Sequence, residues 1–290
     1  EADRQQVNGI ALAEFLASID IKIAKGQVLK PQQFNGILER VRDTVVWYSR
    51  ENVIAGNRVR DSRYGAHLMY SHHNRLTNNH FQSNTVGMFL MYANDNTIAD
   101  NVVRNSQGPS GIGIGFKESS RVRVEHNDVT ASARGVYLDA SPDDPDGPNV
   151  FSENRLAYNG VAVAFHSTGE GSEFGANSFI GNHTVATFGG GGSIERNRWK
   201  GNYWGEYDGF DRDRDGVGDT PYRVWSWADR LWMDVADAQF FRSAPSLELI
   251  DLVERLGALT EPRLLLSDAA PRIAPVPQAG ARVDTKGLPQ

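Results

Sequence analysis

Soft metal ligands gather in one short stretch of the chain, GAHLMYSHHN, which contains His67, Met69, His72 and His73. A second methionine, Met91, follows Met69 by 22 residues. Thioether and imidazole groups without hard oxygen ligands form a set suited to Cu(I). Exposed methionines also make an adaptable docking surface, and the same side chains could instead form a second core layer beneath a loop. Which chemistry is open to them depends on which of them share a face.

Acidic residues form a second candidate site. The stretch DRDRDGVGD places Asp211, Asp213, Asp215 and Asp219 at positions 1, 3, 5 and 9 of an EF-hand-like loop, with glycine at position 6. Alternating aspartates can direct their carboxylates at one hard cation. Position 12 is Tyr222 instead of glutamate, and no helix pair is evident, so the sequence argues against a full EF-hand. A turn stabilised by Ca²⁺ and a solvated turn held by neighbouring arginines both stay open.

A third acidic group lies in SPDDPDG, with Asp143, Asp144 and Asp146 just after Asp139. Paired carboxylates can cleave glycosidic bonds, which makes a carbohydrate-binding or carbohydrate-cleaving protein the alternative function, with Asp139 and Asp143 near its site. Three of the four aspartates fall in one proline-rich insertion, which is typical of a loop. The chain shows no nucleophile signature and no phosphate-binding glycine loop, so we expect no enzyme.

Composition limits the remaining classes of function. The chain has 290 residues and a formal charge of −6, and its Lys and Arg residues are scattered, so we expect no nucleic-acid partner. No apolar run reaches the roughly 18 to 20 residues of a membrane span. The absence of cysteine excludes disulfides and cysteine–metal sites.

A repeat predicts the elements that must position these residues. The pattern of Asn, any residue and an apolar residue starts at Asn35 and returns in steps of 22, 22, 22, 26, 27, 23 and 20 residues. Its later members are Asn57, Asn79, Asn101, Asn127, Asn154, Asn177 and Asn197. A second series, Asn52, Asn74 and Asn96, keeps the period of 22. Each unit is too short for a pair of helices but holds two or three short strands.

The repeat predicts an all-β protein, a right-handed parallel β-helix, in which each coil adds one rung about 4.8 Å from the last. Asparagine tolerates the left-handed turn conformation, and its amide can stack on the rung above. The longer steps coincide with QGPSG and SPDDPDGP, which we expect to be loops inserted between strands. A β-sandwich with coincidental spacing is the competing interpretation.

Alternation within the glycine-led strands predicts which side chains face outward. Met88, Leu90, Tyr70 and Tyr92 should point inward. One outward column should contain Val45, His67, Phe89, Gly113, Tyr137 and Ala162. The other should contain Trp47, Met69, Met91, Gly115, Asp139 and Ala164. We therefore predict a Cu(I) transfer stripe at His67, Met69 and Met91, flanked by partner-binding residues Trp47, Phe89 and Tyr137.

The ends of the chain differ from its middle. Residues 1–205 are predicted to form the coils, with IDIKIA as an early strand. Residues 206–245 should form an acidic and aromatic loop region that caps the solenoid. Within residues 246–290, SLELIDLVERLG fits an amphipathic helix ended by Gly257, and a proline-rich extended tail should follow.

Four segments combine into a specific pattern, namely NSQGPSGIGIGFKE, GVYLDASPDDPDG, FGGGGSIERNRWKGNYWGEYDGFDRDRDGVGDTPY and FFRSAPSLELID. These segments resemble the NosD family of nitrous oxide reductase maturation proteins. The run from GNYW to GDTPY occurs in other β-helix proteins, but its combination with GPSGxGxGFK, YLDxSP and LMYS is specific. The resemblance covers about Ile19 to Pro271, which is most of the chain.

The resemblance implies a periplasmic β-helix at the outer face of the inner membrane. It implies attachment to an ABC transporter, whose membrane subunit and ATPase are separate chains. It also implies cooperation with a lipoprotein copper chaperone that supplies nitrous oxide reductase. Family members usually have more N-terminal coils and a leader, so we expect this chain, which begins at Glu1, to be a mature or truncated form. The resemblance fixes no copper ligands, so the ligand prediction rests on the outward stripe.

Overall fold

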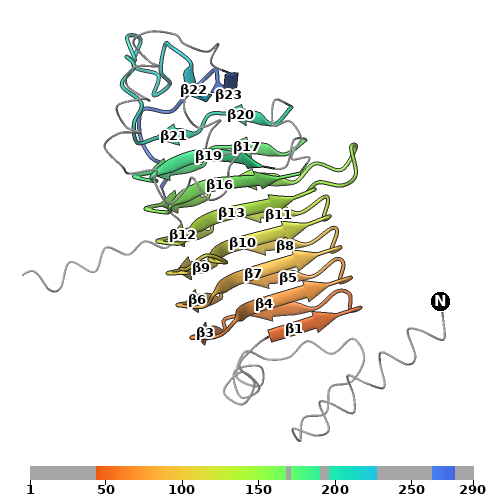
Figure 1. Ribbon diagram of the computed structural model, residues 1–290. Coiled ribbons are helices and arrows are strands. Elements are labelled where there is room, and N and C mark those ends of the chain that lie inside the picture. The colour runs from red at the N-terminus through yellow and green to blue at the C-terminus, as the bar shows by residue number, and fades with distance from the viewer. Residues whose placement is uncertain (1–43, 168–170, 190–195, 227–262, 278–290) are drawn as a thin grey trace, which may run out of the picture.

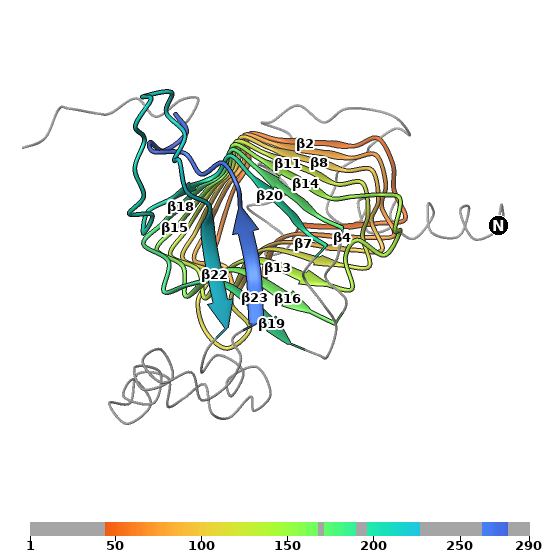
Figure 2. The ribbon, with the colours of Figure 1, turned by 90° about the horizontal axis from the view of Figure 1, so that it is seen from above.

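The chain folds into a parallel β-solenoid. A computed structural model describes residues 44–167, 171–189, 196–226 and 263–277. Every regular element in these ranges is a strand, and the strands stack coil on coil into three sheets (Figures 1 and 2). The predicted all-β parallel architecture is therefore confirmed. Within the same ranges there is no helix of the length and apolarity needed to cross a membrane.

Each coil gives one strand to each sheet. The long-strand sheet contains β1 (Thr44–Trp47), β4 (Tyr64–Met69), β7 (Val86–Met91), β10 (Ile112–Lys117), β13 (Arg134–Asp139), β16 (Val161–His166) and β19 (Thr184–Gly189). The second sheet contains β2 (Val53–Ala55), β5 (Arg75–Thr77), β8 (Thr97–Ala99), β11 (Arg123–Glu125), β14 (Val150–Ser152), β17 (Glu173–Gly175), β20 (Arg198–Lys200), β23 (Arg263–Asp268) and β22 (Tyr222–Ser226). The third contains β3 (Arg58–Arg60), β6 (His80–Gln82), β9 (Val102–Arg104), β12 (Asp128–Thr130), β15 (Arg155–Ala157), β18 (Ser178–Ile180) and β21 (Tyr203–Trp204).

Buried asparagines tie the coils together at the corners. Asn79 donates from its backbone N and its Nδ2 to Asn101 Oδ1, both at 2.9 Å, and Nδ2 also donates to Ile54 O. The ladder contains Asn57, Asn79, Asn101, Asn127, Asn154, Asn177 and Asn202. Each buried amide satisfies backbone groups that the turn leaves unpaired, and each such bond contributes about 1 kcal/mol net.

Two predictions about the ladder are wrong. The left-handed conformation belongs to the residue before each asparagine, as at Asn78 (φ 55) and Asp100 (φ 56), and this turn directs the next side chain into the coil. Asn197 belongs to the neighbouring ladder, since its Oδ1 accepts the backbone N–H of Ser172 at 2.9 Å. Asn202 takes the predicted place of Asn197. Both asparagines are followed by one residue and a tryptophan, so the pattern alone does not separate them.

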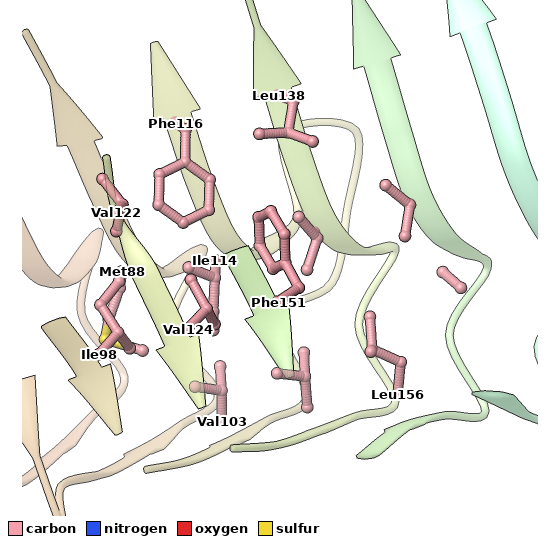
Figure 3. Close-up of a cluster of buried hydrophobic side chains, with 14 of the residues drawn as sticks. Met88, Ile98, Val103, Ile114, Phe116, Val122, Val124, Leu138, Phe151 and Leu156 are labelled. Atoms are coloured by element: carbon pink, nitrogen blue, oxygen red, sulfur yellow. The ribbon is translucent and has the colours of Figure 1, made fainter. Parts of the chain in front are cut away.

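The core lies inside the coils and is built from aligned apolar side chains. Leu68, Leu90, Phe116 and Leu138 follow one another in register on the long-strand sheet and are fully buried. Figure 3 shows the middle of this core, where Ile98 and Val124 of the second sheet face Met88 and Ile114. Full burial of each such side chain contributes about 1.5–3 kcal/mol.

The register of the long-strand sheet corrects the predicted columns. Gly115 pairs with Phe89 and Tyr137, and Lys117 pairs with Met91 and Asp139. Gly115 thus takes the position expected for Gly113, Lys117 takes the position expected for Gly115, and Ala164 takes that of Ala162. Alternation fixes the face of a strand, but a shift of two residues leaves the alternation unchanged.

The predicted inward positions of Tyr70 and Tyr92 are also wrong. Both residues follow the end of their strand and adopt positive φ, 50° and 52°. Their rings and that of Tyr48 stack outside the corner, with centroids 4.9 and 4.8 Å apart. The aromatic residues Phe116 and Phe165 lie in the core instead, in register with Leu90 and Leu138, and Leu90 precedes Tyr92 by two positions.

The upper end of the described solenoid is closed by strands that the sequence did not predict. β23 adds to the second sheet beside β20, and β22 pairs antiparallel with β23. The buried Asp268 at the end of β23 accepts N–H groups of Asn202 and Trp204. The loops at QGPSG and SPDDPDGP lie between strands as predicted. The predicted IDIKIA strand and the helix at 246–257 lie outside the described residues.

Candidate functional site

The structure brings His67 and Met91 together on the outer face of the long-strand sheet. His67 Nε2 lies 3.3 Å from Met91 Sδ, although the two residues come from different coils. Met69 is in register with Met91 and points to the same side, and Trp47 is in register with Met69 one coil below. His67, Met69 and Met91 are half-buried, whereas Trp47 is 54% exposed. The predicted stripe is thus one local cluster of soft side chains.

The cluster fits a soft cation. Bond lengths of about 2.0–2.3 Å to nitrogen and sulfur separate two ligands of one ion by about 3–4 Å, and the imidazole–thioether distance falls in that range. The three side chains provide one nitrogen and two sulfurs and no carboxylate. Such a donor set favours Cu(I) over hard cations such as Ca²⁺ or Mg²⁺.

The outward column that contains Met69 and Met91 continues with charged side chains beyond Met91. Lys117 Nζ lies 3.5 Å from Asp139 Oδ2, and His166 Nδ1 lies 3.0 Å from Asp139 Oδ1. The charge of Asp139, then that of Tyr92, raises the pKa of Lys117. The soft cluster therefore ends at Lys117, and Asp139 lies between the side chains of Lys117 and His166.

Ser167, His166 and Asp139 resemble a catalytic triad in type but not in geometry. Ser167 Oγ lies 3.1 Å from His166 Nδ1, the same ring nitrogen that contacts Asp139. A general base must approach the serine with the nitrogen that the carboxylate does not hold. This arrangement therefore gives no activated serine.

Tyr137 lies in the same outward column as Phe89 but outside the soft cluster. The guanidinium of Arg134 lies 5.2 Å from the centre of its ring, and the ring of His166 lies 6.4 Å away on the next coil. Burial raises the pKa of Tyr137, so its hydroxyl stays protonated at neutral pH. As a partner-binding residue it would act beside the charged half of the column.

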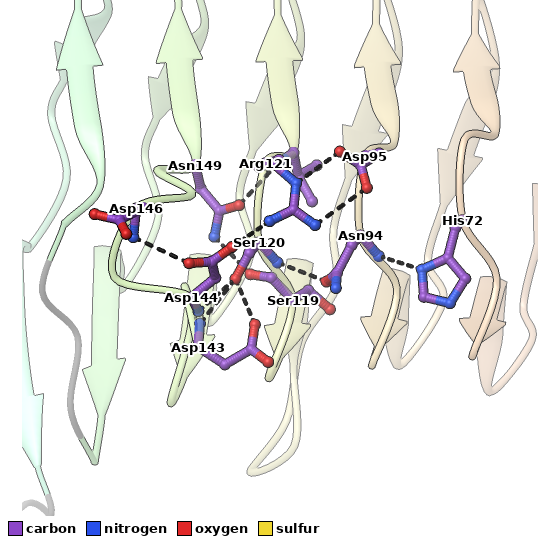
Figure 4. A network of polar contacts seen from close by, with 11 residues as sticks. His72, Asn94, Asp95, Ser119, Ser120, Arg121, Asp143, Asp144, Asp146 and Asn149 are labelled. Carbon is purple, nitrogen blue, oxygen red and sulfur yellow. Dashed lines mark hydrogen bonds and ion pairs between the residues drawn. The ribbon is translucent and has the colours of Figure 1, made fainter.

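His72 and His73 belong to a corner and not to the soft cluster. His72 Nδ1 accepts the backbone N–H of Asn94 at 3.1 Å, and Asn94 Oδ1 accepts the backbone N–H of Ser120 (Figure 4). Burial, then the charge of Arg50, lowers the pKa of His72. His72 therefore has a structural role as a neutral hydrogen-bond acceptor.

The aspartates of the SPDDPDG loop stabilise the same corner. Asp143 hydrogen-bonds with Ser120, and Asp144 forms an ion pair with Arg121. Arg121 also donates to Asp95 Oδ1 at 2.8 Å, and this hydrogen bond lowers the pKa of Asp95. The two carboxylates named for the carbohydrate alternative thus have different partners: Asp143 contacts Ser120 at this corner, and Asp139 contacts Lys117 and His166 on the long-strand sheet.

The acidic loop brings three of its four predicted ligands together. Carboxylate oxygens of Asp211, Asp213 and Asp215 lie within 4.8 Å of one another. Asp219 instead accepts the backbone N–H of Arg212 at 2.9 Å. The backbone N–H of Asp215 lowers the pKa of Asp213, but the negative charges of Asp215 and Asp219 and the contact with Asp211 outweigh it and raise that pKa.

Sequence reasoning missed the side chains that surround the soft cluster. Tyr64 stacks on His67, and Lys117 follows Met91 in the column. Tyr64 precedes Gly65, where the alternating pattern was taken to begin, so no outward position was assigned to it. Leu90 is followed by Met91, and Phe116 is followed by Lys117. Aligning Phe116 with Leu90, both apolar, would therefore have placed Lys117 beside Met91.

Comparison with known proteins decides the family. Residues 15–209, more than half of the chain, match the family described as "Periplasmic copper-binding protein (NosD)". The chain belongs to the NosD family. The soft cluster on β4 and β7 lies inside the segment that matches NosD, whereas the four aspartates of the acidic loop, which starts at Asp211, lie just beyond it.

Two curated NosD relatives show similarity over part of the chain. The "Probable ABC transporter binding protein NosD" of Pseudomonas aeruginosa is 30% identical over 137 residues, which cover 46% of this chain. The protein of the same description from Stutzerimonas stutzeri is 28% identical over 111 residues, or 37% of this chain. Each match spans only 25% of the relative's length.

Among solved structures, the fluoroquinolone resistance protein QnrB1 matches 53% of this chain and 80% of its own. The identity is 11% and the TM-score 0.15, so this likeness supports no argument.

Proposed function

We propose that this NosD chain is a non-enzymatic accessory protein that handles copper during maturation of nitrous oxide reductase. It would act in the periplasm, at the outer face of the inner membrane, beside an ABC transporter whose membrane subunit and ATPase are other chains. The family description and the names of the two relatives support copper binding, the periplasm and the transporter. The resemblance of the motifs supports the chaperone lipoprotein and the reductase as partners.

The close approach of His67 Nε2 to Met91 Sδ, 3.3 Å, carries the assignment of the site. His67, Met69 and Met91 would accept Cu(I) and pass it on. Their partial exposure leaves one side of the ion open to a ligand from another protein. A site with few protein ligands on a rigid sheet suits transfer because the cargo can leave without a rearrangement of the coils.

The apolar surround supports a docking surface for the copper chaperone and the apo-reductase. Trp47 and Val45 are 54% and 44% exposed, and they lie one coil below Met69 and His67. Phe89 and Tyr137 continue the surface along the column. An exposed tryptophan beside the ligands is a typical anchor of an interface.

Cu(I) titration with a competing chelator tests this proposal. The variant Met69→Ala/Met91→Ala should lose most of the affinity of the native chain, while His183→Ala, at an exposed position on another coil, should keep it. A pull-down with the chaperone and the reductase, repeated with Trp47→Ala, tests the docking surface. Unchanged Cu(I) affinity and unchanged chaperone binding in the double methionine variant would refute the assignment of the stripe.

We also propose that Asp211, Asp213 and Asp215 bind Ca²⁺ in the native loop, with Asp219 holding the turn. The convergence of the three carboxylates supports this. Ca²⁺ should raise the melting temperature of the native chain, and Asp213→Asn should abolish that shift. An equal shift in both proteins, or none in the native chain, would count against the site.

A further inference from the structure

His67 lies between two aromatic rings from different coils. The ring of Tyr64, on the same strand, stacks on the imidazole with centroids 4.7 Å apart and an interplanar angle of 20°. Phe89, on β7, meets the imidazole edge-on at 6.3 Å and 77°. Contacts on a face and at an edge restrict rotation of the imidazole. They hold its Nε2 toward Met91 Sδ.

Phe89 in turn occupies the space above a glycine. Gly115 on β10 is in register with Phe89. A Cβ atom on Gly115 would lie 2.3 Å from Cδ2 and 2.4 Å from Cε2 of Phe89. Cβ atoms do not approach other carbons this closely, so the ring fills the volume that a side chain at position 115 would need. This explains why Gly115 is buried although it belongs to the outward column.

We infer that Gly115 is a positioning residue for the soft-metal site, acting through Phe89 on the orientation of His67. The inference rests on the proposed Cu(I) function of His67, Met69 and Met91. Gly115 lies two strands from His67 and provides no ligand atom itself. Its role is to leave room for the ring that fixes the imidazole before the metal arrives.

The backbone allows a sharp test of this role. Gly115 is not among the residues with positive φ, so alanine fits its backbone without strain. The closest obstacle to the new methyl group is the Phe89 ring, and Ile112 Cγ2 at 3.2 Å is the next. In Gly115→Ala the ring must therefore move, and the edge contact with His67 is lost.

Cu(I) affinity provides the first readout. Immobilising one side chain on binding costs about 0.5–1.5 kcal/mol, so Gly115→Ala should weaken Cu(I) binding about two- to tenfold. Phe89→Ala should weaken it to a similar extent. In a Phe89→Ala background, Gly115→Ala should have no further effect because the clash no longer exists. The matched control is Gly175→Ala, where the nearest atom to the new Cβ is Lys200 O at 3.7 Å.

NMR of the copper-free protein provides the second readout. The ring protons of His67, assigned with His67→Gln, should shift in Gly115→Ala and in Phe89→Ala and stay in place in Gly175→Ala. An unmoved His67 signal, or an equal loss of affinity from Gly115→Ala in both backgrounds, would overturn the inference. If the His67 signal moves as expected but Met69→Ala/Met91→Ala binds Cu(I) as the native chain does, the positioning of His67 stands and the proposed copper site fails.

Discussion

At the scale of single residues, the soft cluster exists because side chains from successive coils point to the same side of one sheet. His67 and Met69 belong to β4, whereas Met91 belongs to β7, 22 residues later than Met69. The sheet register, and not proximity in sequence, sets their separation. His72 and His73 are closer to Met69 in sequence, but the corner carries them away from it.

The thioether of Met91 should contribute to Cu(I) binding, whereas that of Met88 on the same strand should not. Met91→Leu keeps the volume of the side chain and removes the sulfur that faces His67, so Cu(I) affinity should fall at least about tenfold, which corresponds to about 1.4 kcal/mol. Met88→Leu, in the core of the same strand, should leave affinity unchanged and cost less than about 1.5 kcal/mol of stability. Chelator competition and denaturant titration measure the two effects. Equal affinities of Met91→Leu and the native chain would contradict the prediction.

His72 should make stability depend on pH below neutrality. Its pKa is lowered in the folded protein, so the unfolded chain binds a proton more readily. The stability from neutral His72 is complete above its unfolded pKa of about 6.5. It is lost progressively as the pH falls from there toward the lower folded pKa. Protonated Nδ1 cannot accept the N–H of Asn94.

Denaturant titrations between pH 7.5 and pH 5 measure this effect. His72→Gln, which retains an acceptor but does not titrate, should reduce the slope of stability against pH. His183→Asn serves as the control because His183 is exposed and lies on a distant coil. A slope that stays the same in His72→Gln would exclude this role.

At the scale of the elements, the corner ladders hold the coils in register. Asn101 accepts two N–H bonds from Asn79 and donates to Leu76 O, Ala99 O and Asn127 Oδ1. Asn101→Ala removes these bonds and leaves buried partners unsatisfied, so unfolding free energy should drop by about 2–4 kcal/mol. Arg75→Ala, at an exposed strand position, is the control. If urea titration shows that the free energy of unfolding falls by less than about 1 kcal/mol, other interactions compensate for the lost ladder bonds, which would contradict the prediction.

The sequence predicts the elements well and their alignment less well. The asparagine period and the alternation of apolar residues determine the coils, the faces and the stripe at His67, Met69 and Met91. GIGIGF, in contrast, repeats glycine and isoleucine every second residue, so Gly111 and Gly113 are equally good starting points for the alignment. The error places a glycine where Lys117 lies. The aromatic contacts of His67 depend on side-chain rotation, which no spacing in the sequence encodes.

At the scale of the whole molecule, each coil contacts mainly the coils before and after it, so the ends need separate protection. β23 covers the edge of β20, and Asp268 takes the place that the next ladder asparagine would occupy. Its carboxylate accepts five N–H bonds: from Gly201 N, Asn202 N, Asn202 Nδ2, Trp204 Nε1 and Ala270 N. Each ladder asparagine donates its N–H groups to the next one along the solenoid. The last asparagine therefore needs a partner that only accepts hydrogen bonds, and a carboxylate is such a partner.

Asp268→Asn should therefore destabilise the upper end. The substituted amide presents one NH₂ group to N–H donors, and each donor left unsatisfied costs about 1–3 kcal/mol. The melting temperature should fall, and hydrogen exchange should speed up first at Asn202 and Trp204. Asp208→Asn, at an exposed position, should change neither. Uniform exchange along the coils in Asp268→Asn would show that the carboxylate does not close this end specifically.

The register of β4 on β7 also bears on how such a protein can change over evolution. A tandem duplication of residues 64–85 is 22 residues long, which equals the offset between Ala66 and Met88. It would insert one whole coil, with every later side chain still on its original face. The new coil would carry a second histidine and a second methionine directly beside the first pair. A donor array of this kind can therefore lengthen by copying whole coils, whereas an insertion of a single residue inside β7, between Val86 and Met91, would turn Met91 to the opposite face of the sheet.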